Sequence, residues 1–416
     1  MEVREPSAKY LAKPAYKQTG VGVIPADWEV KPLGEIGEAL IGLTYKPAEV
    51  RDHGTLVLRS SNIQNDALSF EDSVFVNAEI PARIMVRSDD VLICVRNGSR
   101  DLIGKSALLD ERTKGMTFGA FMAVYRSPIG KLASYLFQSA ILKRQINEHL
   151  GATINQITNR SLNSFQIPVP PTETEQRAIA TALSDVDALL GGLERLIAKK
   201  RDLKQAAMQQ LLTGQTRLPG FSGEWEVKRL GELAKIQRGA SPRPIDSPAW
   251  FEENSTVGWV RISDVTSSGM FLCETTQRLS PLGVKHSRPV ATGSLIMSIC
   301  ATVGRPIITR IDVCIHDGFV VFDNLEADQL FAYYVLKWIE PDWTRHGQTG
   351  SQMNLNTGLI NGTVIKLPPR AEQTAIAAVL SDMDAELSAL AARRDKSRDL
   401  KQAMMQELLT GRIRLV

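Results

Sequence analysis

Apolar residues recur at steps of four and three along two separate stretches of the chain. They are Ile179, Leu183, Val186, Leu190, Leu193 and Ile197 in the first stretch, and Ile376, Leu380, Met383, Leu387 and Leu390 in the second. This spacing places apolar side chains in one seam of a helix, as in a coiled coil. It predicts two long helices, over 172–212 and 370–410, and the first, of 41 residues, would be about 60 Å long. Thr172 and Glu175 fit a capping box at its start.

The two helical stretches are copies of one another. Residues 176–218 align with residues 373–415 at a constant offset of 197 without a gap, and 26 of the 43 pairs are identical. A match of that length marks a duplicated structural unit. Gly214 and Gly411 occupy the same place after each copy, where a glycine readily takes the left-handed conformation that ends a helix.

The regions before the two helices repeat as well, with more divergence. The tetrapeptide Trp-Glu-Val-Lys opens both, at 28–31 and 225–228, and apolar runs rich in Val and Ile follow in the same order. Tyr135 and Tyr333 each begin a short apolar-periodic segment, which predicts a matching helix in both copies. Strand-like runs broken by Gly and polar loops indicate a mixed α+β or a mostly β domain, and with the helices they predict an α+β fold with two tandem mixed α/β domains. The expected boundaries are an N-terminal arm over 1–26, domains over 27–171 and 215–369, and helices over 172–214 and 370–416.

Composition narrows the class of protein. A chain of 416 residues has room for two to four domains, and its net charge of +3 permits nucleic-acid binding without requiring it. The cysteines Cys94, Cys273, Cys300 and Cys314 are scattered, with no CxxC pair, which fits a reducing compartment. No apolar run approaches a membrane span, and the first twenty residues do not resemble a signal peptide. These features predict a cytoplasmic protein.

Motifs that could carry catalysis are incomplete. The segment 98–106 resembles a phosphate-binding loop, but five residues separate its glycines instead of four. The second copy has Gly304-Arg305-Pro306 at the matching place, and proline lacks the amide donor. Glu29 to Lys31 and Glu226 to Lys228 resemble the end of a nuclease motif without its upstream acidic partner. The five histidines do not cluster with metal ligands. The chain is therefore predicted to have neither a catalytic centre nor a metal site.

Polar groups suited to DNA recognition gather where apolar runs end. Arginine can read guanine, asparagine and glutamine can read adenine, and aspartate accepts a hydrogen bond from cytosine. The candidates are Arg59, Ser61, Asn62, Gln64, Arg96, Asn97, Ser99, Arg100, Asn155 and Gln156 in the first domain, and Arg261, Ser263, Asp264, Lys285, His286, Arg288, Arg305, Ser351, Gln352 and Asn354 in the second. A loop of this kind taken singly is more often just solvated surface, and Arg59 and Arg261 could instead bind a carboxylate of their own domain. Equivalent sets on two related domains favour DNA binding.

Together these features resemble the specificity subunit of type I restriction–modification systems. The resemblance covers nearly the whole chain and rests on the ordered segments IPADWEVKPLGEI, IPVPPTETEQRAIA, LPPRAEQTAIAAVL, QLLTG and ELLTG. It implies two target-recognition domains, each binding one half of a split DNA site, and two spacer helices paired antiparallel as a coiled coil. That pairing would put Leu183, Leu190, Leu193, Leu380, Leu387 and Leu390 in a shared seam. The second helix departs from the first at Ala371 and Thr374, which predicts a weaker capping box.

The resemblance also implies partners and cofactors. Double-stranded DNA would bind the chain, and two modification subunits would dock on it and methylate adenine with S-adenosylmethionine. Restriction subunits that use ATP and Mg could join, while this chain would bind no cofactor and catalyse no reaction. Two alternatives remain: a DNA-modifying or ATP-using enzyme with its site at 98–106, and a scaffold that binds no DNA and uses its helices only for assembly.

Overall fold

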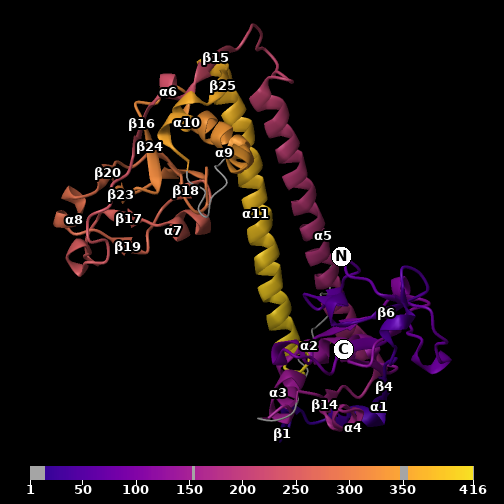
Figure 1. Cartoon of the computed structure of the whole chain (residues 1–416). Helices are drawn as coiled ribbons and strands as arrows, with labels where there is room; N and C mark the ends of the chain where they lie inside the picture. The colour runs from indigo at the N-terminus through magenta and orange to yellow at the C-terminus, as the bar shows by residue number, and fades with distance from the viewer. Residues whose placement is uncertain (1–14, 152–154, 347–354, 416) are drawn as a thin grey trace, which may run out of the picture. The chain divides into compact units, whose positions relative to one another are not determined.

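The chain folds into two compact units. The computed structural model describes residues 15–151, 155–346 and 355–415. Unit 1 comprises Met1–Glu194 and Arg393–Val416, and unit 2 comprises Arg195–Ala392. Each unit holds one mixed α/β domain, part of helix α5 (Glu173–Thr213) and part of helix α11 (Arg370–Leu408) (Figure 1). The predicted fold class, two related α/β domains with two long helices, is confirmed. No helix in the described ranges is long and apolar enough to cross a membrane.

Two four-stranded sheets form the centre of the domain of unit 1, and the pairs β1–β2, β3–β14 and β7–β8 accompany them. One has the order β11-β10-β13-β4 and is antiparallel, and the other has the order β12-β6-β9-β5, with β12 and β6 parallel. The strands are β1 (Tyr16–Thr19), β2 (Gly22–Pro25), β3 (Glu29–Pro32), β4 (Glu38–Ile41), β5 (Val50–Arg51), β6 (Thr55–Leu58), β7 (Ile63–Gln64), β8 (Ala67–Leu68), β9 (Phe75–Val76), β10 (Val91–Cys94), β11 (Ser106–Leu108), β12 (Thr117–Phe118), β13 (Met122–Arg126) and β14 (Gln166–Val169). The helices are α1 (Leu33–Ile36), α2 (Gly130–Gln138), α3 (Ala140–His149) and α4 (Asn159–Ser164), with short turns η1 (Pro47–Glu49), η2 (Ser60–Asn62), η3 (Ala82–Ile84), η4 (Arg100–Leu102) and η5 (Glu111–Thr113).

Unit 2 repeats this plan. Its sheets have the orders β16-β24-β21-β22-β18 and β19-β17-β23-β20, and β15 pairs with β25 as β3 pairs with β14. The strands are β15 (Glu226–Arg229), β16 (Lys235–Arg238), β17 (Gly258–Val260), β18 (Phe271–Leu272), β19 (Gln277–Arg278), β20 (Arg288–Val290), β21 (Leu295–Ser298), β22 (Pro306–Thr309), β23 (Val313–Ile315), β24 (Phe319–Asp323) and β25 (Val364–Leu367). The helices are α6 (Leu230–Leu233), α7 (Ile262–Ser267), α8 (Pro281–Lys285), α9 (Gln329–His346) and α10 (Thr357–Gly362), with the turn η6 (Pro248–Trp250).

The two copies differ from the sequence expectation in two places. The arm expected over 1–26 contains the hairpin β1–β2, whose Val21 and Ile24 are buried in the core of unit 1. The expected match of Tyr135 with Tyr333 is wrong by one residue, because Tyr135 and Tyr334 hold equivalent places. The hydroxyl of Tyr135 donates to Asp187 at 2.9 Å, and that of Tyr334 donates to the equivalent carboxylate of α11 at 2.8 Å.

Within each unit, α5 and α11 run antiparallel, and the start of one helix meets the end of the other (Figure 1). In unit 1 the buried Ile179 and Leu183 share a core with Met405, Leu408 and Leu409. In unit 2 the same arrangement has its own buried members, which are Met208, Leu211, Leu212, Ile376, Ala377 and Leu380. Of the other expected seam residues, Leu193 and Ile197 are buried, while Val186, Leu190, Met383, Leu387 and Leu390 are half-buried. Ile179, Leu183, Ile376 and Leu380, which also pack against a domain core, are at most 1% exposed, and Leu193 and Ile197 are buried outside those cores at 5% and 3% exposure.

Lysines in the helical seam make ion pairs across the two helices. In unit 2, Lys204 lies 2.5 Å from Asp384 and Lys200 lies 2.7 Å from Glu386. In unit 1, Lys401 lies 2.7 Å from Asp187. Lys204 and Lys401 occupy equivalent places in the repeat, and each also lies 5.4 Å from the ring centre of the tyrosine that binds its partner carboxylate. Polar residues thus fix the register of the pairing where the apolar seam is interrupted.

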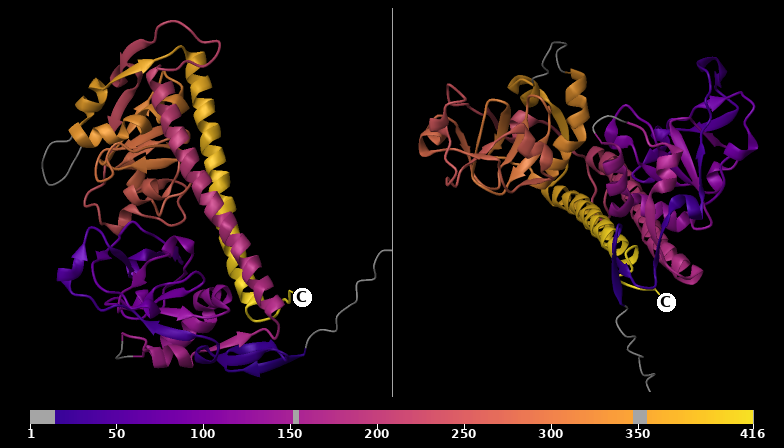
Figure 2. Two further views of the ribbon diagram at one scale, coloured as in Figure 1. Left: turned by 90° about the vertical axis from the view of Figure 1, so that its right-hand side faces the viewer. Right: turned by 90° about the horizontal axis from the view of Figure 1, so that it is seen from below.

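Glycines end both long helices as predicted. Gly214 and Gly411 have φ of 72° and 69°, which is the left-handed conformation. A side chain on Gly411 would also meet Pro25 and Trp28, because the end of α11 lies against the start of the domain. Figure 2 shows the indigo hairpin β1–β2 beside the yellow end of α11, where the hydroxyl of Tyr16 donates to the carbonyl of Arg412. The last residues of the chain therefore complete unit 1.

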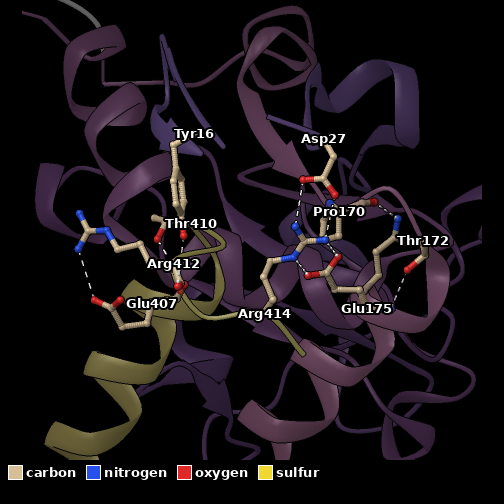
Figure 3. Close-up of polar contacts among 10 residues, drawn as sticks. Tyr16, Asp27, Pro170, Thr172, Glu175, Glu407, Thr410, Arg412 and Arg414 are labelled. Carbon is tan, nitrogen blue, oxygen red and sulfur yellow. Dashed lines mark hydrogen bonds and ion pairs between the residues drawn. The ribbon is translucent and has the colours of Figure 1, made fainter. Parts of the chain in front are cut away.

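An arginine beyond α11 binds the start of α5. Arg414 donates to the carboxylates of Glu175 and Asp27, with contacts of 2.8 Å to Glu175 and of 3.0 and 3.1 Å to Asp27 (Figure 3). The Glu175 side chain is 1% exposed, and the guanidinium lies 5.6 Å from the ring centre of Trp28. The hydrogen bonds from Arg414 lower the pKa of the Asp27 carboxyl. Half of the expected capping box is present, since the Thr172 hydroxyl accepts from the Glu175 amide while the Glu175 carboxylate binds Arg414.

Unit 2 has the same closure at the positions 197 residues away. Arg217 makes two contacts of 2.5 Å to the buried Glu372, and the indole of Trp225 donates to the same carboxylate at 3.2 Å. The guanidinium of Arg217 lies 5.4 Å from the ring centre of Trp225. The repeat therefore preserves an arginine, a buried glutamate and a tryptophan together.

Candidate nucleic-acid interface

A capped turn follows the equivalent strands β6 and β17. In unit 1 the amide of Arg59 donates to the side-chain carbonyl of Asn62 at 2.8 Å, and η2 forms. In unit 2 the amide of Arg261 donates to the carboxylate of Asp264 at 2.8 Å, and α7 forms. A short polar side chain three residues after the arginine can satisfy this amide, which explains the shared Arg-x-x-Asn/Asp spacing. The turn positions a polar loop at the end of a buried strand in both domains.

The expectation that Asn62 and Asp264 contact bases is corrected. Asn62 is 0% exposed, and its amide donates to the carbonyls of Ser69 and Asp72, at 3.0 Å each. Asp264 is also buried and accepts from the amide of Thr276 at 3.1 Å. Both side chains use their hydrogen-bonding groups inside the domain, because a buried polar group must be satisfied there. They hold the recognition loops in place.

Arg59 and Arg261 directly follow β6 and β17, and the side chain of each contacts a residue in the segment after the capped turn. Arg59 forms an ion pair with Asp72 at 2.7 Å, which is the alternative to DNA contact that the sequence left open. Its Nε is buried without a hydrogen-bond partner. Arg261 donates to the side-chain carbonyl of Gln277 at 2.8 Å and lies 5.9 Å from the ring centre of Trp259. The partner of Arg261 is a neutral amide, whereas the positive charge of Arg59 is partly offset by the carboxylate of Asp72.

Several candidates that are distant in sequence come together in unit 1. Asn97 donates to the hydroxyl of Ser60 at 3.3 Å, which joins the loop after β10 to the loop after β6. Arg96 and Gln156 form an isolated β-bridge, which adds a third segment. The guanidinium of Arg96 lies 5.2 Å from the ring centre of Phe121. Exposed members of this surface are Gln64, Arg96, Ser99, Arg100, Asn155 and Gln156, while Ser61 and Asn97 are half-buried. The hydroxyl oxygen of Ser61 is buried without a partner.

Phe121 was not predicted from the sequence. It is 59% exposed and precedes β13, in an apolar run that reads as ordinary strand. Unit 2 has Gly318 directly before the equivalent strand β24, so this aromatic group is specific to the first domain. The signal available in the sequence was this Phe-to-Gly difference between copies whose flanking strands match.

The candidates of unit 2 gather around the sheet β19-β17-β23-β20. Arg288 pairs in register with Ile315, and Ile315 pairs with the last residue of β17. Arg288 and Arg261 therefore lie at the same end of these neighbouring strands. Arg288 donates to Gln237 at 2.8 Å, and Arg305 donates to the carbonyl of Ser268 at 3.3 Å. The exposed members are Ser263, Lys285 and His286, and His286 lies 5.4 Å from the ring centre of Trp250. Ser351, Gln352 and Asn354 lie outside the described residues.

A buried histidine lies beside this surface. His316 accepts a hydrogen bond from the amide of Gly318 at 2.9 Å and packs between Trp259 and Phe319. Burial lowers the pKa of His316, although Asp317 opposes the shift. The ring is therefore neutral at pH 7 and contributes no charge to the surface.

The segment 98–106 does not fold as a phosphate-binding loop. It contains the turn η4 and leads into strand β11, whereas a phosphate-binding loop leads into the N-terminus of a helix. Arg100 in this segment donates to the carbonyl of Asn147 at 3.4 Å. Among the described residues, no group of His, Cys, Asp and Glu is arranged to hold a metal ion.

Known proteins resemble the whole chain. The Putative type I restriction enzyme MjaX specificity subunit of Methanocaldococcus jannaschii is 27% identical over 429 residues, covering 96% of this chain and 97% of that protein. The Type I restriction enzyme EcoKI specificity subunit of Escherichia coli strain K12 is 26% identical over 245 residues, covering 54% of this chain and 52% of that protein.

Two solved structures share the fold. A chain from a study of complex assembly and conformational transition in the type I R-M system has a TM-score of 0.59 at 20% identity, covering 94% of this chain and 99% of its own. The S subunit of a type I restriction-modification system from M. genitalium has a TM-score of 0.58 at 16% identity, covering 92% and 96%.

The family comparison follows the repeat. The model of the type I restriction modification DNA specificity domain matches residues 25–200 and again residues 222–396. Each match begins three residues before one of the repeated tryptophans, Trp28 or Trp225, and ends within a long helix, so the two matches reproduce the duplicated unit. The chain therefore belongs to the family of type I restriction modification DNA specificity proteins, with two copies of the family's domain.

Proposed function

We propose that this chain reads a bipartite DNA target, one half-site with the domain of unit 1 and the other with the domain of unit 2. The observation that carries the proposal is the same capped turn in both domains, which presents different side chains. Arg59 and Gln64 follow β6, whereas Arg261 and Gln277 flank the matching turn of unit 2. A shared scaffold with different loops can read two different sequences.

In this proposal, the duplicated helices provide the surfaces on which the partner subunits bind. Two modification subunits dock on equivalent surfaces of the chain, because the same sequence is presented twice. They methylate adenine with S-adenosylmethionine, and restriction subunits with ATP and Mg join the complex. This chain supplies recognition and spacing, holds no cofactor, and acts in the cytoplasm. The strand that follows segment 98–106 supports placing the nucleotide chemistry in other subunits.

Exchange of one domain tests the division of labour. Residues 30–168 are replaced by the corresponding domain of a relative, and the methylated motif is read by methylome sequencing of cells that carry the complete system. We expect one half of the motif to change and the other half to stay. A simultaneous change of both halves would contradict the assignment of one half-site to each domain.

The enzyme alternative has its own test. The purified chain is incubated with S-adenosylmethionine and DNA, and separately with ATP, without any other subunit. We expect no methyl transfer and no ATP hydrolysis above background. Either activity, retained after purification to homogeneity and lost in a Lys105→Ala variant, would favour a catalytic role for segment 98–106.

A further inference from the structure

The β1–β2 hairpin covers one face of unit 1. Its base lies at the end of α11, and its tip lies against α3 and β14. Arg144 of α3 donates to the carbonyl of Gly20 at 3.3 Å, and Gln166 of β14 lies next to the same residue. Val21 and Ile24 of the hairpin are buried. The covered face therefore consists of the end of a long helix, the strand pair β3–β14 and a domain helix.

Unit 2 has the same face, and none of its described residues forms a hairpin over it. The end of α5, the strand pair β15–β25 and the helix α9 form a groove of about 320 Å³. Its apolar lining is exposed: Val227 is 66% exposed, Val364 is 56% exposed and Trp338 is 37% exposed. The described linker 214–225, which precedes β15, contains no strand. Exposed aliphatic and aromatic side chains gathered in one place mark an interaction site more often than an accident of composition.

Matched positions show what the cover does. Val30 in β3 is half-buried and packs against the core of unit 1, while Val227 at the same place in β15 is mostly exposed. Pro168 is buried where it pairs with Val30, and Lys366 is exposed where it pairs with Val227. The difference lies in the covering hairpin, since the strands themselves pair in the same register.

Charge adds a second requirement. Lys366 lines the groove, and no ion pair of its ammonium is found within the described part of unit 2. Two other lysines of the elements that form the groove, Lys228 of β15 and Lys337 of α9, are paired with Glu226 and Glu340. A segment that fills the groove would therefore gain from a carboxylate placed near Lys366.

We propose that the groove lined by Leu212, Val227, Trp338, Ile339 and Val364 binds an apolar, hairpin-like segment of another polypeptide, which carries a carboxylate for Lys366. The covering hairpin of unit 1 is the template for the shape and for the paired aliphatic side chains of the occupant. Because the matching face of unit 1 is already covered, one such segment binds per chain. The site thus distinguishes the two halves of an otherwise duplicated molecule. It goes beyond the proposed DNA reading and does not depend on it.

A cyclised peptide of residues 15–27 serves as the probe, because an isolated hairpin is only marginally stable in water. Its fluorescence anisotropy is measured during titration with the full chain. We expect saturable binding of one peptide per chain, weakened at least tenfold by Val227→Lys and by Val364→Lys. These side chains are largely exposed, so the variants should keep the melting temperature of the parent chain. The matched control is Leu359→Lys, an exposed leucine outside the groove, which should bind as the parent does.

The charge requirement is tested with a second peptide. In this probe Thr19, beside the hairpin tip, is replaced by glutamate, which should tighten binding several-fold. The gain should vanish in the Lys366→Ala variant. Absence of the gain in the parent chain would overturn the carboxylate part of the proposal.

Three results would overturn the proposal that the groove binds a hairpin. The first is the absence of saturable binding to the parent chain. The others are binding that Val227→Lys and Val364→Lys leave unchanged, and a stoichiometry of two equivalent peptides per chain. The groove could instead bind a second copy of this chain, and sedimentation of the chain without peptide tests that alternative. A concentration-dependent dimer that Val227→Lys abolishes would show that the groove closes on its own counterpart and would contradict a foreign segment.

Discussion

Removal of the Arg414 guanidinium, whose side chain is 19% exposed, should destabilise unit 1 strongly. The Arg414→Met variant keeps the apolar stem and leaves the Glu175 carboxylate without its cation, although that side chain is 1% exposed. Loss of one partner of a buried ion pair costs about 3–5 kcal/mol, because the remaining charge stays desolvated. For a unit of this size, each kcal/mol lowers the melting temperature by about 2–4 °C, so a fall of about 6–20 °C is expected.

Hydrogen exchange followed by mass spectrometry locates the effect, and calorimetry measures its size. Amides at the start of α5 and in β3 should exchange faster, by about two to four orders of magnitude where exchange requires unfolding of unit 1. The control is Arg412→Met, two residues away, whose ion pair with Glu407 is half-exposed and worth at most about 1 kcal/mol. Arg217→Met should produce the large effect in unit 2 instead, since Glu372 is fully buried.

A double variant separates charge from packing. Replacing Glu175 by Gln in the Arg414→Met background removes the unpaired charge, so part of the lost stability should return. The reasoning would be refuted if Arg414→Met behaved like Arg412→Met, or if Glu175→Gln lowered stability further in the double variant.

Three further variants test other features. Leu183→Ala should cost about 2–5 kcal/mol because its side chain is fully buried, whereas Leu190→Ala, at a half-buried site, should cost less in the same urea titration. Arg96→Ala should leave the melting temperature unchanged and either lower the salt slope of DNA binding by about one unit or relax one position of the target, while Asn62→Ala should cost about 1–3 kcal/mol of stability. For His316 the folded pKa is lowered, so its contribution to stability is complete above about pH 6.5 and is lost as the pH falls toward the folded pKa. His316→Gln should therefore flatten the pH dependence of stability between about pH 7 and 5, with chemical unfolding at each pH as the measurement.

The sequence predicted the architecture well because the repeat constrains it twice. The constant offset located both long helices and both left-handed glycines, and each feature appears in the structure. The hairpin β1–β2 was missed because Gly20, Gly22 and Pro25 break its alternating pattern, and it has no counterpart in the second copy to reveal it. A duplicated sequence identifies what its copies share and gives no guidance where one copy has an addition.

The candidate site was harder to predict because one residue type can serve two roles. Asn62 and Asp264 have the chemistry of base contacts and equally that of turn caps, and only their burial and partners decide between these roles. The ion pair of Arg59 with Asp72 joins residues thirteen apart across a loop whose path the sequence does not specify. Tyr333 and Tyr334 are adjacent, so only the hydrogen bond to Asp384 shows which one matches Tyr135.

The contribution of the last residues to unit 1 affects the order of folding during synthesis. Every residue of unit 2 has been added once the ribosome reaches residue 392, but the core of unit 1 still lacks Met405, Leu408 and Arg414. At about 5–20 residues per second, the first domain leaves the ribosome and then waits roughly ten to forty seconds for these partners. Ile179 and Leu183 remain uncovered on that side for the whole interval, although their domain was translated first. The half of the molecule that is made first is thus the last to be finished.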